Sequence, residues 1–554
     1  MSCLAHAAWA QTPQDIERAQ QQGQQLLQQQ QQLERQQREL EESRRRAPSG
    51  ADLRTTPPAP VASEGPCSRI NDIVLDGATR LSESEQVRLV QPYLGKCLAL
   101  ADINRLISEI TNDYVERGYI TTRAYIPQQD LAGGRLTLKI VEGRVESLRM
   151  DPAASGSVAT AFPGLAGGIL NLRDFEQGID QLNRLSSNSA RIDIEPGADP
   201  GTSQVVVHDE ARKRWLASIS VDNSGSASTG YDMVAASFGI DNALGFNDYF
   251  NLNARHSEAG PGTARSSDSG GLYWNLPYGY WNFSTAVNGF DYKSLVQGTV
   301  SSFVTKGTSD SQALRADRVV YRDQSRKWSF TGGLTLKQTR NYIAGEKIVS
   351  SSADLTLLDL GTSLTWAYGG ALFSLNAGIT RGVNALEATK DDHTRPDGAP
   401  QAQYQKITYG ASVLKSFEAG PVPLSWQTTI SGQDSHNALY GTEQIAIGNL
   451  YTVRGFRTTV LSGKGGAYVR NDLGMPLPLA RLLGSAAPNG QIRPYIGYDA
   501  GHIASAGTLS GWAAGVALSA GPATLQIMYA RPLSMPSFFT RETGWLYASL
   551  ALTY

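Results

Sequence analysis

Cysteine is the residue type with the most distinctive chemistry in this 554-residue chain, and it occurs three times. Cys3 lies in the opening segment MSCLAHAAWA, which ends in Ala-Trp-Ala at residues 8–10, a small-x-small site that suits signal peptidase. Removal of that segment leaves Cys67 and Cys97. An even pair of cysteines in an exported protein predicts one disulfide.

The other residue types that could support catalysis or bind a metal form no recognisable site. Six histidines are scattered and never cluster with cysteine or with paired acids, so we expect no metal site. The sequence contains neither a GxxxxGK[ST] phosphate loop nor a GxSxG nucleophile elbow. The net charge of −2 gives no electrostatic reason to propose nucleic acid as a partner. We therefore predict that the chain is not an enzyme and uses no cofactor.

The N-terminal part is divided into three segments by its composition. Residues 1–10 are interpreted as a signal-peptide remnant. Residues 11–45 are glutamine-rich and predict one polar helix about 50 Å long; a weak coiled coil or disordered low complexity is the alternative. So polar a helix cannot face lipid, but it could lie in a water-filled pore as a plug. Residues 46–66 are rich in Pro, Ala and Ser and predict an extended linker.

Two small α/β units follow, at residues 67–143 and 144–211, each with the predicted order β-α-α-β-β. In the first unit Ser82 and Glu85 form a capping box, and Asp102 is expected to cap the second helix. The second unit repeats the order more loosely. Such an internal repeat indicates two domains of one kind.

Residues 212–554 alternate apolar and polar positions, with Gly- and Asn-rich turns between the alternating segments. No stretch of 18 apolar residues occurs, which excludes a helical membrane span, whereas a transmembrane β-barrel remains possible. The length suits about 16 antiparallel strands. A soluble β-sandwich or propeller is the alternative, but the sustained alternation favours the barrel. The last segment shows it most clearly, with one face formed by Leu546, Ala548, Leu550, Leu552 and Tyr554.

In order, these pieces resemble the two-partner secretion transporters of the ShlB/FhaC/HecB and CdiB type, which are relatives of BamA. The two α/β units resemble POTRA domains. Segments 221–230 and 241–248 resemble the family's first barrel strands and first hairpin. The resemblance implies an all-β transmembrane barrel in the cell outer membrane, preceded by two periplasmic α+β POTRA-like domains and by the polar helix.

Two further motifs carry the residues to which the resemblance assigns a role. The segment Val453-Arg454-Gly455-Phe456 resembles the tip of the long extracellular loop that folds back into the lumen. The segment YIGYDAG resembles the wall strand that faces this tip, and it supplies Tyr495, Gly497, Asp499 and Gly501. The resemblance implies that Arg454 pairs with Asp499 and holds the loop against the wall.

The resemblance also implies a function, the export of one large secreted protein that carries an N-terminal secretion domain. We expect a monomer in contact with outer-membrane lipid, which receives an unfolded client through its POTRA-like domains and works without ATP. The pair Cys67 and Cys97 resembles the haemolysin and contact-inhibition branch; a cytolysin, an adhesin and a contact-dependent toxin all remain open as the client. A BamA-type assembly factor is the alternative, although that type usually has more POTRA units. A passive porin would have none.

Overall fold

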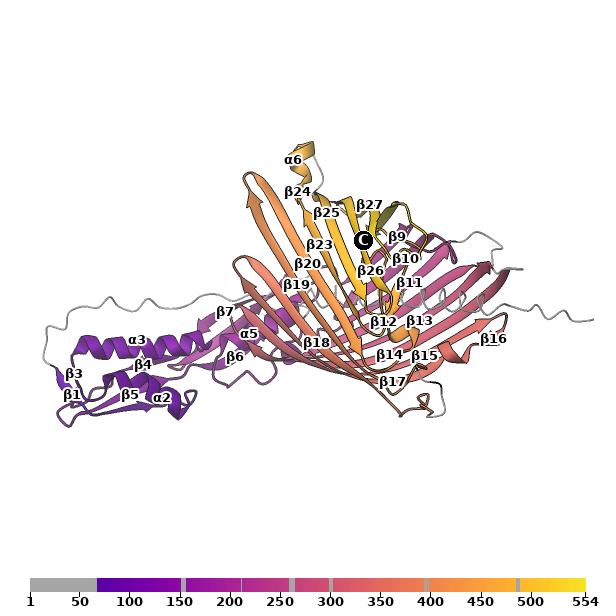
Figure 1. The fold of residues 1–554 in the computed structure, drawn as a ribbon. Coiled ribbons are helices and arrows are strands. Elements are labelled where there is room, and N and C mark those ends of the chain that lie inside the picture. The colour runs from indigo at the N-terminus through magenta and orange to yellow at the C-terminus, as the bar shows by residue number, and fades with distance from the viewer. Residues whose placement is uncertain are drawn as a thin grey trace, which may run out of the picture.

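The computed structural model describes residues 67–150, 156–210, 212–258, 265–297, 302–392, 396, 398–484 and 489–554. The signal remnant, the plug helix and the linker predicted within residues 1–66 lie outside the described residues. The described chain forms a β-barrel with an elongated arm built from the residues before it (Figure 1). The predicted fold class is confirmed: 16 long antiparallel strands close into a barrel, preceded by two α+β units.

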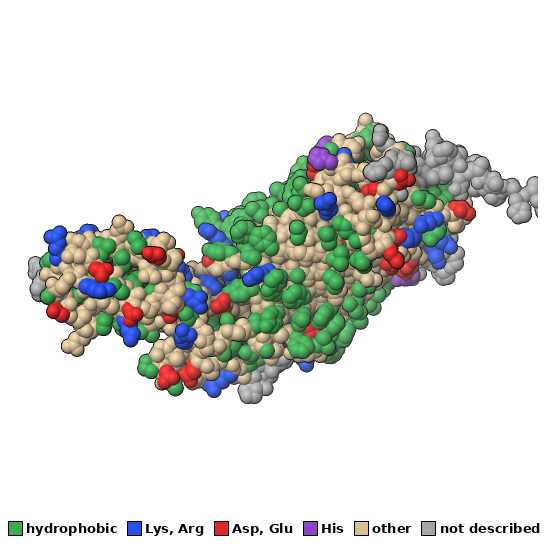
Figure 2. Space-filling view, turned by 90° about the horizontal axis from the view of Figure 1, so that it is seen from below, with side chains coloured by type: hydrophobic (Ala, Val, Ile, Leu, Met, Phe, Trp, Pro, Cys, Tyr) green, Lys and Arg blue, Asp and Glu red, His purple; other side chains and the backbone are tan. Residues whose placement is uncertain are grey.

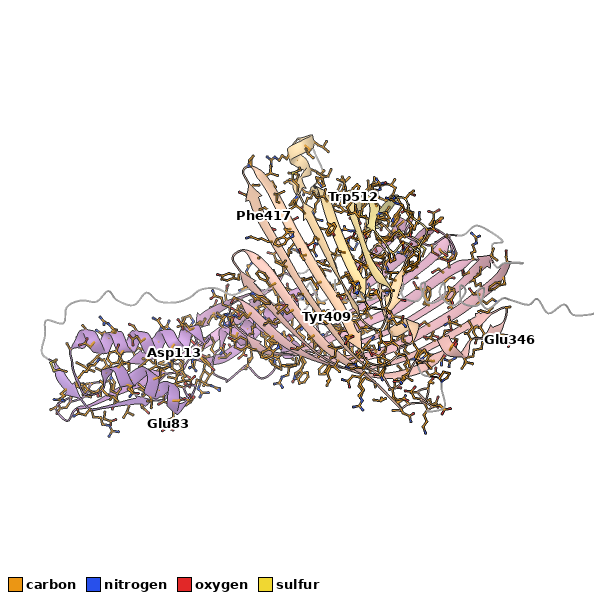
Figure 3. The ribbon with its side chains drawn as sticks, viewed as in Figure 1. Glu83, Asp113, Glu346, Tyr409, Phe417 and Trp512 are labelled. Atoms are coloured by element: carbon orange, nitrogen blue, oxygen red, sulfur yellow. A yellow bond between two sulfur atoms is a disulfide. The ribbon has the colours of Figure 1, made fainter. Side chains whose placement is uncertain are left out.

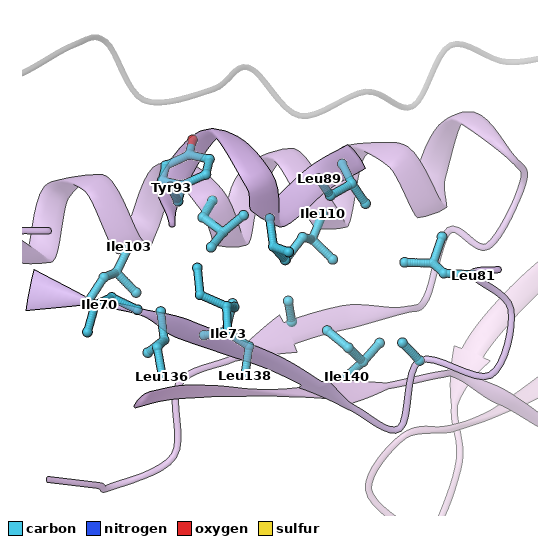
Figure 4. Close-up of a cluster of buried hydrophobic side chains, with 14 of the residues drawn as sticks. Ile70, Ile73, Leu81, Leu89, Tyr93, Ile103, Ile110, Leu136, Leu138 and Ile140 are labelled. Atoms are coloured by element: carbon cyan, nitrogen blue, oxygen red, sulfur yellow. The ribbon is translucent and has the colours of Figure 1, made fainter. Parts of the chain in front are cut away.

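The first unit of the arm packs two helices against a three-stranded sheet. Its sheet has the order β2-β5-β4, and β2 runs parallel to β5. Ile110 on one helix and Leu136 and Leu138 on the central strand are fully buried between the layers (Figure 4). The elements are β1 (Ser68–Ile70), β2 (Asp72–Asp76), α2 (Glu83–Val90), η1 (Gln91–Tyr93), β3 (Lys96–Leu98), α3 (Leu100–Glu116), β4 (Arg123–Tyr125) and β5 (Arg135–Val141).

Local capping signals start both helices of this unit, one as predicted and one not. The backbone N–H of Ser82 donates to Glu85 Oε2 at 2.7 Å, which is half of the predicted capping box. The prediction for Asp102 is wrong, because Ala99 occupies the cap position and α3 begins at Leu100. The Asp102 carboxylate instead reaches back and accepts a hydrogen bond from the Ala99 backbone N–H at 2.9 Å.

The predicted disulfide between Cys67 and Cys97 is confirmed. Cys97 lies on β3, which pairs antiparallel with β1 and places Arg69 opposite Cys97. The sequence did not predict β3, because three residues are too few to show an alternating pattern. The bond therefore ties the first described residue of the arm to the segment that leads into α3.

The second unit repeats the fold with a sheet of order β6-β8-β7. Phe175 and Leu182 of its main helix are buried against the sheet. The elements are β6 (Arg144–Met150), α4 (Val158–Ala161), α5 (Leu172–Asn183), β7 (Arg191–Pro196) and β8 (Thr202–His208). The units join end to end, because the backbone N–H of Leu172 at the start of α5 donates to the carbonyl of Gly118 beyond α3 at 2.8 Å. None of the helices within the described ranges is both long and apolar enough to cross a membrane.

The barrel strands pair with their neighbours in chain order, and all of these pairings are antiparallel. The long strands are β9 (Trp215–Asp222), β10 (Asp232–Asp241), β11 (Tyr249–Glu258), β12 (Ser266–Tyr278), β13 (Trp281–Gln297), β14 (Ser302–Arg322), β15 (Arg326–Ile343), β17 (Ala353–Tyr368), β18 (Ala371–Val383), β19 (Gln405–Ala419), β20 (Val422–Ser435), β23 (Gly466–Gly474), β25 (Gly490–Ile503), β26 (Gly507–Ala520), β27 (Ala523–Ser534) and β28 (Trp545–Thr553). Short elements lie between them: β16 (Glu346–Lys347), η2 (Val349–Ser351), β24 (Leu477–Pro478) and α6 (Leu479–Leu483).

The predicted alternation places apolar side chains on the outside of the barrel. On β28, Leu546 and Leu552 are about half exposed, whereas Tyr547 between them is buried. Hydrophobic side chains cover much of the barrel surface, while the arm shows a mixture of charged, polar and apolar groups (Figure 2). Tyr409 and Phe417 on β19 are exposed members of this surface (Figure 3). Such a surface suits the hydrocarbon core of a bilayer.

The barrel closes where β9 meets β28, and this is the shortest pairing between long strands in the described chain. Five residue pairs are in register there, whereas β9 shares eight pairs with β10. The side chain of Asn223 lengthens the seam, because its Oδ1 accepts from the Ala548 N–H and its Nδ2 donates to the Leu546 carbonyl, both at 2.9 Å. An amide side chain carries the donor and the acceptor of a peptide group, so it extends the ladder by one step.

The second unit of the arm is docked on the turns at the near end of the barrel. The Arg322 side chain at the end of β14 is 1% exposed, and its Nη1 donates to Asp180 Oδ2 of α5 at 2.6 Å. Its Nε lies 3.4 Å from Glu176 Oε2 on the same helix. Gln181 of α5 donates to the carbonyl of Gly279, in the turn between β12 and β13, at 2.9 Å. The buried Arg184 adds a hydrogen bond to the Asn247 carbonyl at 2.6 Å, so both ion pairs and hydrogen bonds fix the arm to the barrel.

Candidate functional site in the barrel lumen

The loop between β20 and β23 starts at the end of the barrel opposite the arm and turns back into the lumen. Within residues 436–465 it forms η3 (Gly441–Glu443) and the antiparallel pair β21 (Ile445–Ile447) and β22 (Leu461–Gly463). Val453 and Phe456 of the loop are fully buried and belong to one apolar cluster with Ile503 and Leu509 of the wall. A loop with this many buried apolar side chains fills the lumen instead of covering an outer surface.

Arg454 lies at the tip of this loop and is 0% exposed. Its Nε donates to Asp499 Oδ2 at 2.6 Å and its Nη2 donates to Asp499 Oδ1 at 2.7 Å. The Arg454 backbone N–H also donates to Asp499 Oδ2 at 3.1 Å. The planar guanidinium thus grips the carboxylate with two parallel hydrogen bonds, the strongest arrangement open to such a pair. The structure brings together the two residues to which the sequence assigned a shared role.

A second carboxylate, which the sequence analysis missed, completes the partners of Arg454. Asp472 on β23 accepts from Arg454 Nη1 at 2.7 Å, and Arg470 Nε on the same strand lies 3.7 Å from Asp472. Two arginines and two aspartates therefore balance in charge, with Asp499 fully buried. Asp472 could have been found only from the register of β23 against β25, which puts it opposite Gly497.

Two glycines give the tip the room it needs. Gly455 has φ +105°, a backbone conformation that side chains disfavour, and a Cβ there would also meet the backbone of Arg531. A Cβ on Gly497 would collide with the Arg454 guanidinium. The wall strand therefore leaves a gap in its side chains where the arginine lies flat against it.

The remaining residues of the two motifs pack around this centre. Gly501 lies against Val453, since a Cβ there would come within 3.1 Å of Val453 Cγ2. Tyr495 is buried below the tip, where its hydroxyl accepts a hydrogen bond from Gln526 Nε2 at 3.0 Å. Phe456 anchors the apolar side of the turn. Together these side chains shape the site; none of them is placed to react.

The segment after the tip is held by Glu542 and Tyr231, which the sequence did not single out, and by Asn223 of the segment 221–230. Glu542 accepts hydrogen bonds from the backbone N–H groups of residues 457, 458 and 459, the shortest at 2.6 Å. The Arg457 guanidinium lies 3.9 Å from the centre of the Tyr231 ring and donates to the Asn223 carbonyl at 2.9 Å. The tip is therefore connected to the seam of the barrel. Glu542 and Tyr231 had no sequence signal, because both lie outside the motifs and come from turns remote in the chain.

The chemistry available in the lumen is recognition and attachment. Among the described residues no group of three His, Cys, Asp or Glu side chains is arranged to hold a metal ion. Arg454 pairs with Asp472 and Asp499, and these ion pairs join the loop to the wall. Such an arrangement can hold or release a segment of chain that obstructs a pore.

Comparison with known proteins agrees with this architecture. The family model described as haemolysin secretion/activation protein ShlB/FhaC/HecB matches residues 201–520. The models described as POTRA domain, ShlB-type, and as POTRA domain match residues 68–143 and 144–196.

Similar proteins are named as transporters. The outer membrane transporter CdiB of Dickeya dadantii is 34% identical, covering 87% of this chain and 86% of its own length. The hemolysin transporter protein ShlB of Serratia marcescens is 31% identical, covering 86% and 82%. The solved structure of CdiB from Escherichia coli is 30% identical with a TM-score of 0.86, and it covers 99% of this chain and 100% of that one. The chain therefore belongs to the ShlB/FhaC/HecB family of two-partner secretion transporters, proteins that are not enzymes and whose barrel lies in the outer membrane with its POTRA domains in the periplasm.

Proposed function

We propose that this chain binds an unfolded partner exoprotein in the periplasm through its POTRA domains and exports it to the cell surface through the barrel without ATP. The observation that carries the proposal is the lumen loop. It obstructs the pore, but its tip is attached through side-chain ion pairs centred on Arg454. An obstruction of this kind can be removed and restored without breaking the barrel.

The arm offers backbone edges that an unfolded client could pair with. In the described chain β2 has β5 as its one sheet neighbour, which leaves the other edge of this five-residue strand open. An extended peptide can add itself to such an edge through main-chain hydrogen bonds, which do not depend on its sequence. The client is a large secreted protein with an N-terminal secretion domain, and the relatives named for CdiB and haemolysin transport support this class.

Energy for export comes from the client itself. The sequence has no GxxxxGK[ST] phosphate loop with which to bind a nucleotide. A client that folds after it emerges cannot slide back, so its folding makes each step of export irreversible.

Secretion and crosslinking together test this function. The transporter is produced with the large exoprotein encoded next to it, and a photo-crosslinking amino acid replaces Val74 on β2. We expect the client in the medium only when the transporter is present, and crosslinks from position 74. The matched position Thr137, on the central strand β5, should give none. Client secretion without the transporter, or equal crosslinking from both positions, would contradict the proposal.

Residues 11–45, which lie outside the described residues, are proposed to plug the lumen at rest. Their deletion should raise ion conductance in planar bilayers while export is retained. An unchanged conductance would reject the plug.

A further inference from the structure

A second buried charge holds the lumen loop at its root, 11 residues before Arg454 in the chain. Glu443 ends η3 and is 4% exposed. Its Oε1 accepts from Lys337 Nζ at 2.8 Å, and its Oε2 accepts from Lys406 Nζ at 2.8 Å. The Tyr404 hydroxyl donates to Oε2 as well, at 2.6 Å. Each carboxylate oxygen therefore accepts a hydrogen bond from one lysine ammonium group.

The partners of Glu443 come from a different part of the wall than those of Arg454. Lys337 lies on β15 and Lys406 on β19, with β17 and β18 between them in the barrel. Arg454 contacts β23 and β25 instead. The backbone of the root is also fixed, because Gln433 on β20 donates to the Glu443 carbonyl at 2.9 Å. The loop is thus attached to the wall at two separate places.

The charge pattern at the root makes the carboxylate indispensable. The side chains of Lys337 and Lys406 are 12% and 6% exposed, so little water reaches either ammonium group. Without the carboxylate, two positive charges would face one another in a closed space, which is strongly unfavourable. One loop residue thus pairs with two wall lysines, and both in turn hold that residue.

We propose that Glu443 is a positioning residue for transport: it fixes the root of the loop to the wall independently of Arg454, and both attachments must open before the loop can leave the lumen. The inference rests on the proposed export route through the barrel. It adds a second attachment of opposite polarity, since at the root the loop supplies the acid and the wall supplies the bases.

Site-specific thiol labelling separates the root from the tip. Cys67 and Cys97 are bonded to each other, so an introduced cysteine becomes the reporter in the described part of the chain. Ala446→Cys reports on the root and Thr452→Cys on the tip; both positions are 2% exposed or less. We expect Glu443→Gln to raise labelling of position 446 by a polar maleimide at least tenfold, with a smaller change at position 452. Arg454→Ala should show the reverse pattern.

Matched variants control for folding and for charge. Glu418→Gln removes an exposed carboxylate from β19 and should leave both labelling rates unchanged. Lys406→Met and Lys337→Met each leave Glu443 with one lysine and should give intermediate labelling at position 446. The exchange of Glu443→Lys with Lys406→Glu should restore part of the protection.

The same variants are tested for ion conductance in planar bilayers, where we expect a rise with Glu443→Gln. If Glu443→Gln fails to assemble, the two lysine variants decide the question. Labelling at position 446 that equals the unmodified protein in all assembled variants, or equal increases at both reporter positions, would overturn the proposal. Neither measurement needs a client, so a chain that exported nothing would still show whether the root is held by Glu443.

Discussion

Two buried arginines attach the lumen loop and the arm to the barrel, and their surroundings differ. At the loop tip Arg454 is enclosed together with Asp499, and both side chains are 0% exposed. At the near rim the buried Arg322 faces two acids of α5, Asp180 and Glu176, whose side chains are 17% and 8% exposed. The second acid at the tip, Asp472, is 16% exposed, so the two places differ in how the contacts are divided. The tip centres on one fully enclosed pair joined by two parallel hydrogen bonds. The rim instead divides its attachment among ion pairs of Arg322 and Lys327 with α5 and hydrogen bonds to backbone carbonyls such as that of Gly279.

This comparison shows how enclosure decides what an ion pair does. Breaking a fully buried pair strands a charge, so the attachment is either complete or lost. At the rim several contacts share the attachment, so the loss of one of them weakens it in a smaller step. The tip is therefore suited to switching, and the rim to holding the arm in place.

The largest effect is expected at the tip. Arg454→Ala or Asp499→Ala strands one buried charge, at a cost of about 3–5 kcal/mol to loop docking. Each variant should strongly reduce client secretion at normal transporter levels, and the exchange of the two charges should restore part of it. Arg493→Ala, which removes a wall arginine that contacts Ser425, is the control and should secrete normally. Normal secretion by both tip variants would contradict the claim that the enclosed Arg454–Asp499 pair matters more for transport than the contacts at the rim.

Loss of the disulfide gives a covalent reference against which the cost of breaking the Arg454 pair can be compared. Replacing Cys67 and Cys97 by serine opens a loop with a sequence separation of 30, which by loop entropy should lower the stability of the first unit by about 3–4 kcal/mol. Thermal unfolding of the double variant and of the parent measures this loss. Free thiols in the denatured, unreduced parent would contradict the bond.

A smaller effect is expected at the rim. Arg322→Ala removes hydrogen bonds between charged groups, worth about 1.5–3 kcal/mol. The acids left behind on α5 keep other cationic partners, since Lys327 faces Asp180 and Arg173 faces Glu176. The distribution of distances between spin labels on α5 and on β14 should become broader. Arg326→Ala in the adjoining turn removes an arginine side chain that is 64% exposed and should leave them narrow. Equal broadening in both variants would show that burial of the arginine is irrelevant.

The smallest effect concerns a partly exposed pair in the first unit. Hydrogen bonds from Arg117, and then from Ser82, lower the pKa of Glu85 from 4.5 to about 2. Because the folded pKa is the lower one, the stabilisation is present above pH 4.5 and is lost as pH falls towards 2. Glu85→Gln should therefore flatten the acid unfolding profile in that window. An unchanged profile would mean that solvent screens the pair completely.

The sequence predicted what depends on short-range patterns and on motifs. The outward face of β28 followed from strict alternation, because a strand with lipid on one side repeats every two residues. Arg454 and Asp499 followed from two local motifs. Asp102 was misplaced by a few residues, because an acid at the third helical position gives nearly the same signal as one at the cap.

The sequence could not predict partners that depend on strand register. Asp472, Glu443 and Arg322 have ordinary neighbours in the chain, and their roles arise only when distant strands and turns come together. Glu443, for example, meets Lys337 across a sequence separation of 106 residues. A one-residue slip in any intervening strand would place such partners on opposite faces of the wall.

The pairing of β9 with β28 is expected to be the last and slowest step of barrel folding. Asn223 contacts Leu546 across a separation of 323 residues, so the closing pairing joins the most distant strands of the barrel. Contacts of such long sequence separation form slowly, because the entropy of closing the chain must be lost first. Until β28 arrives, the free edge of β9 is an open template for pairing with other chains. A barrel that has not yet closed would therefore expose the edge of β9, and we expect shielding of that edge by other proteins to raise the yield of closed barrels.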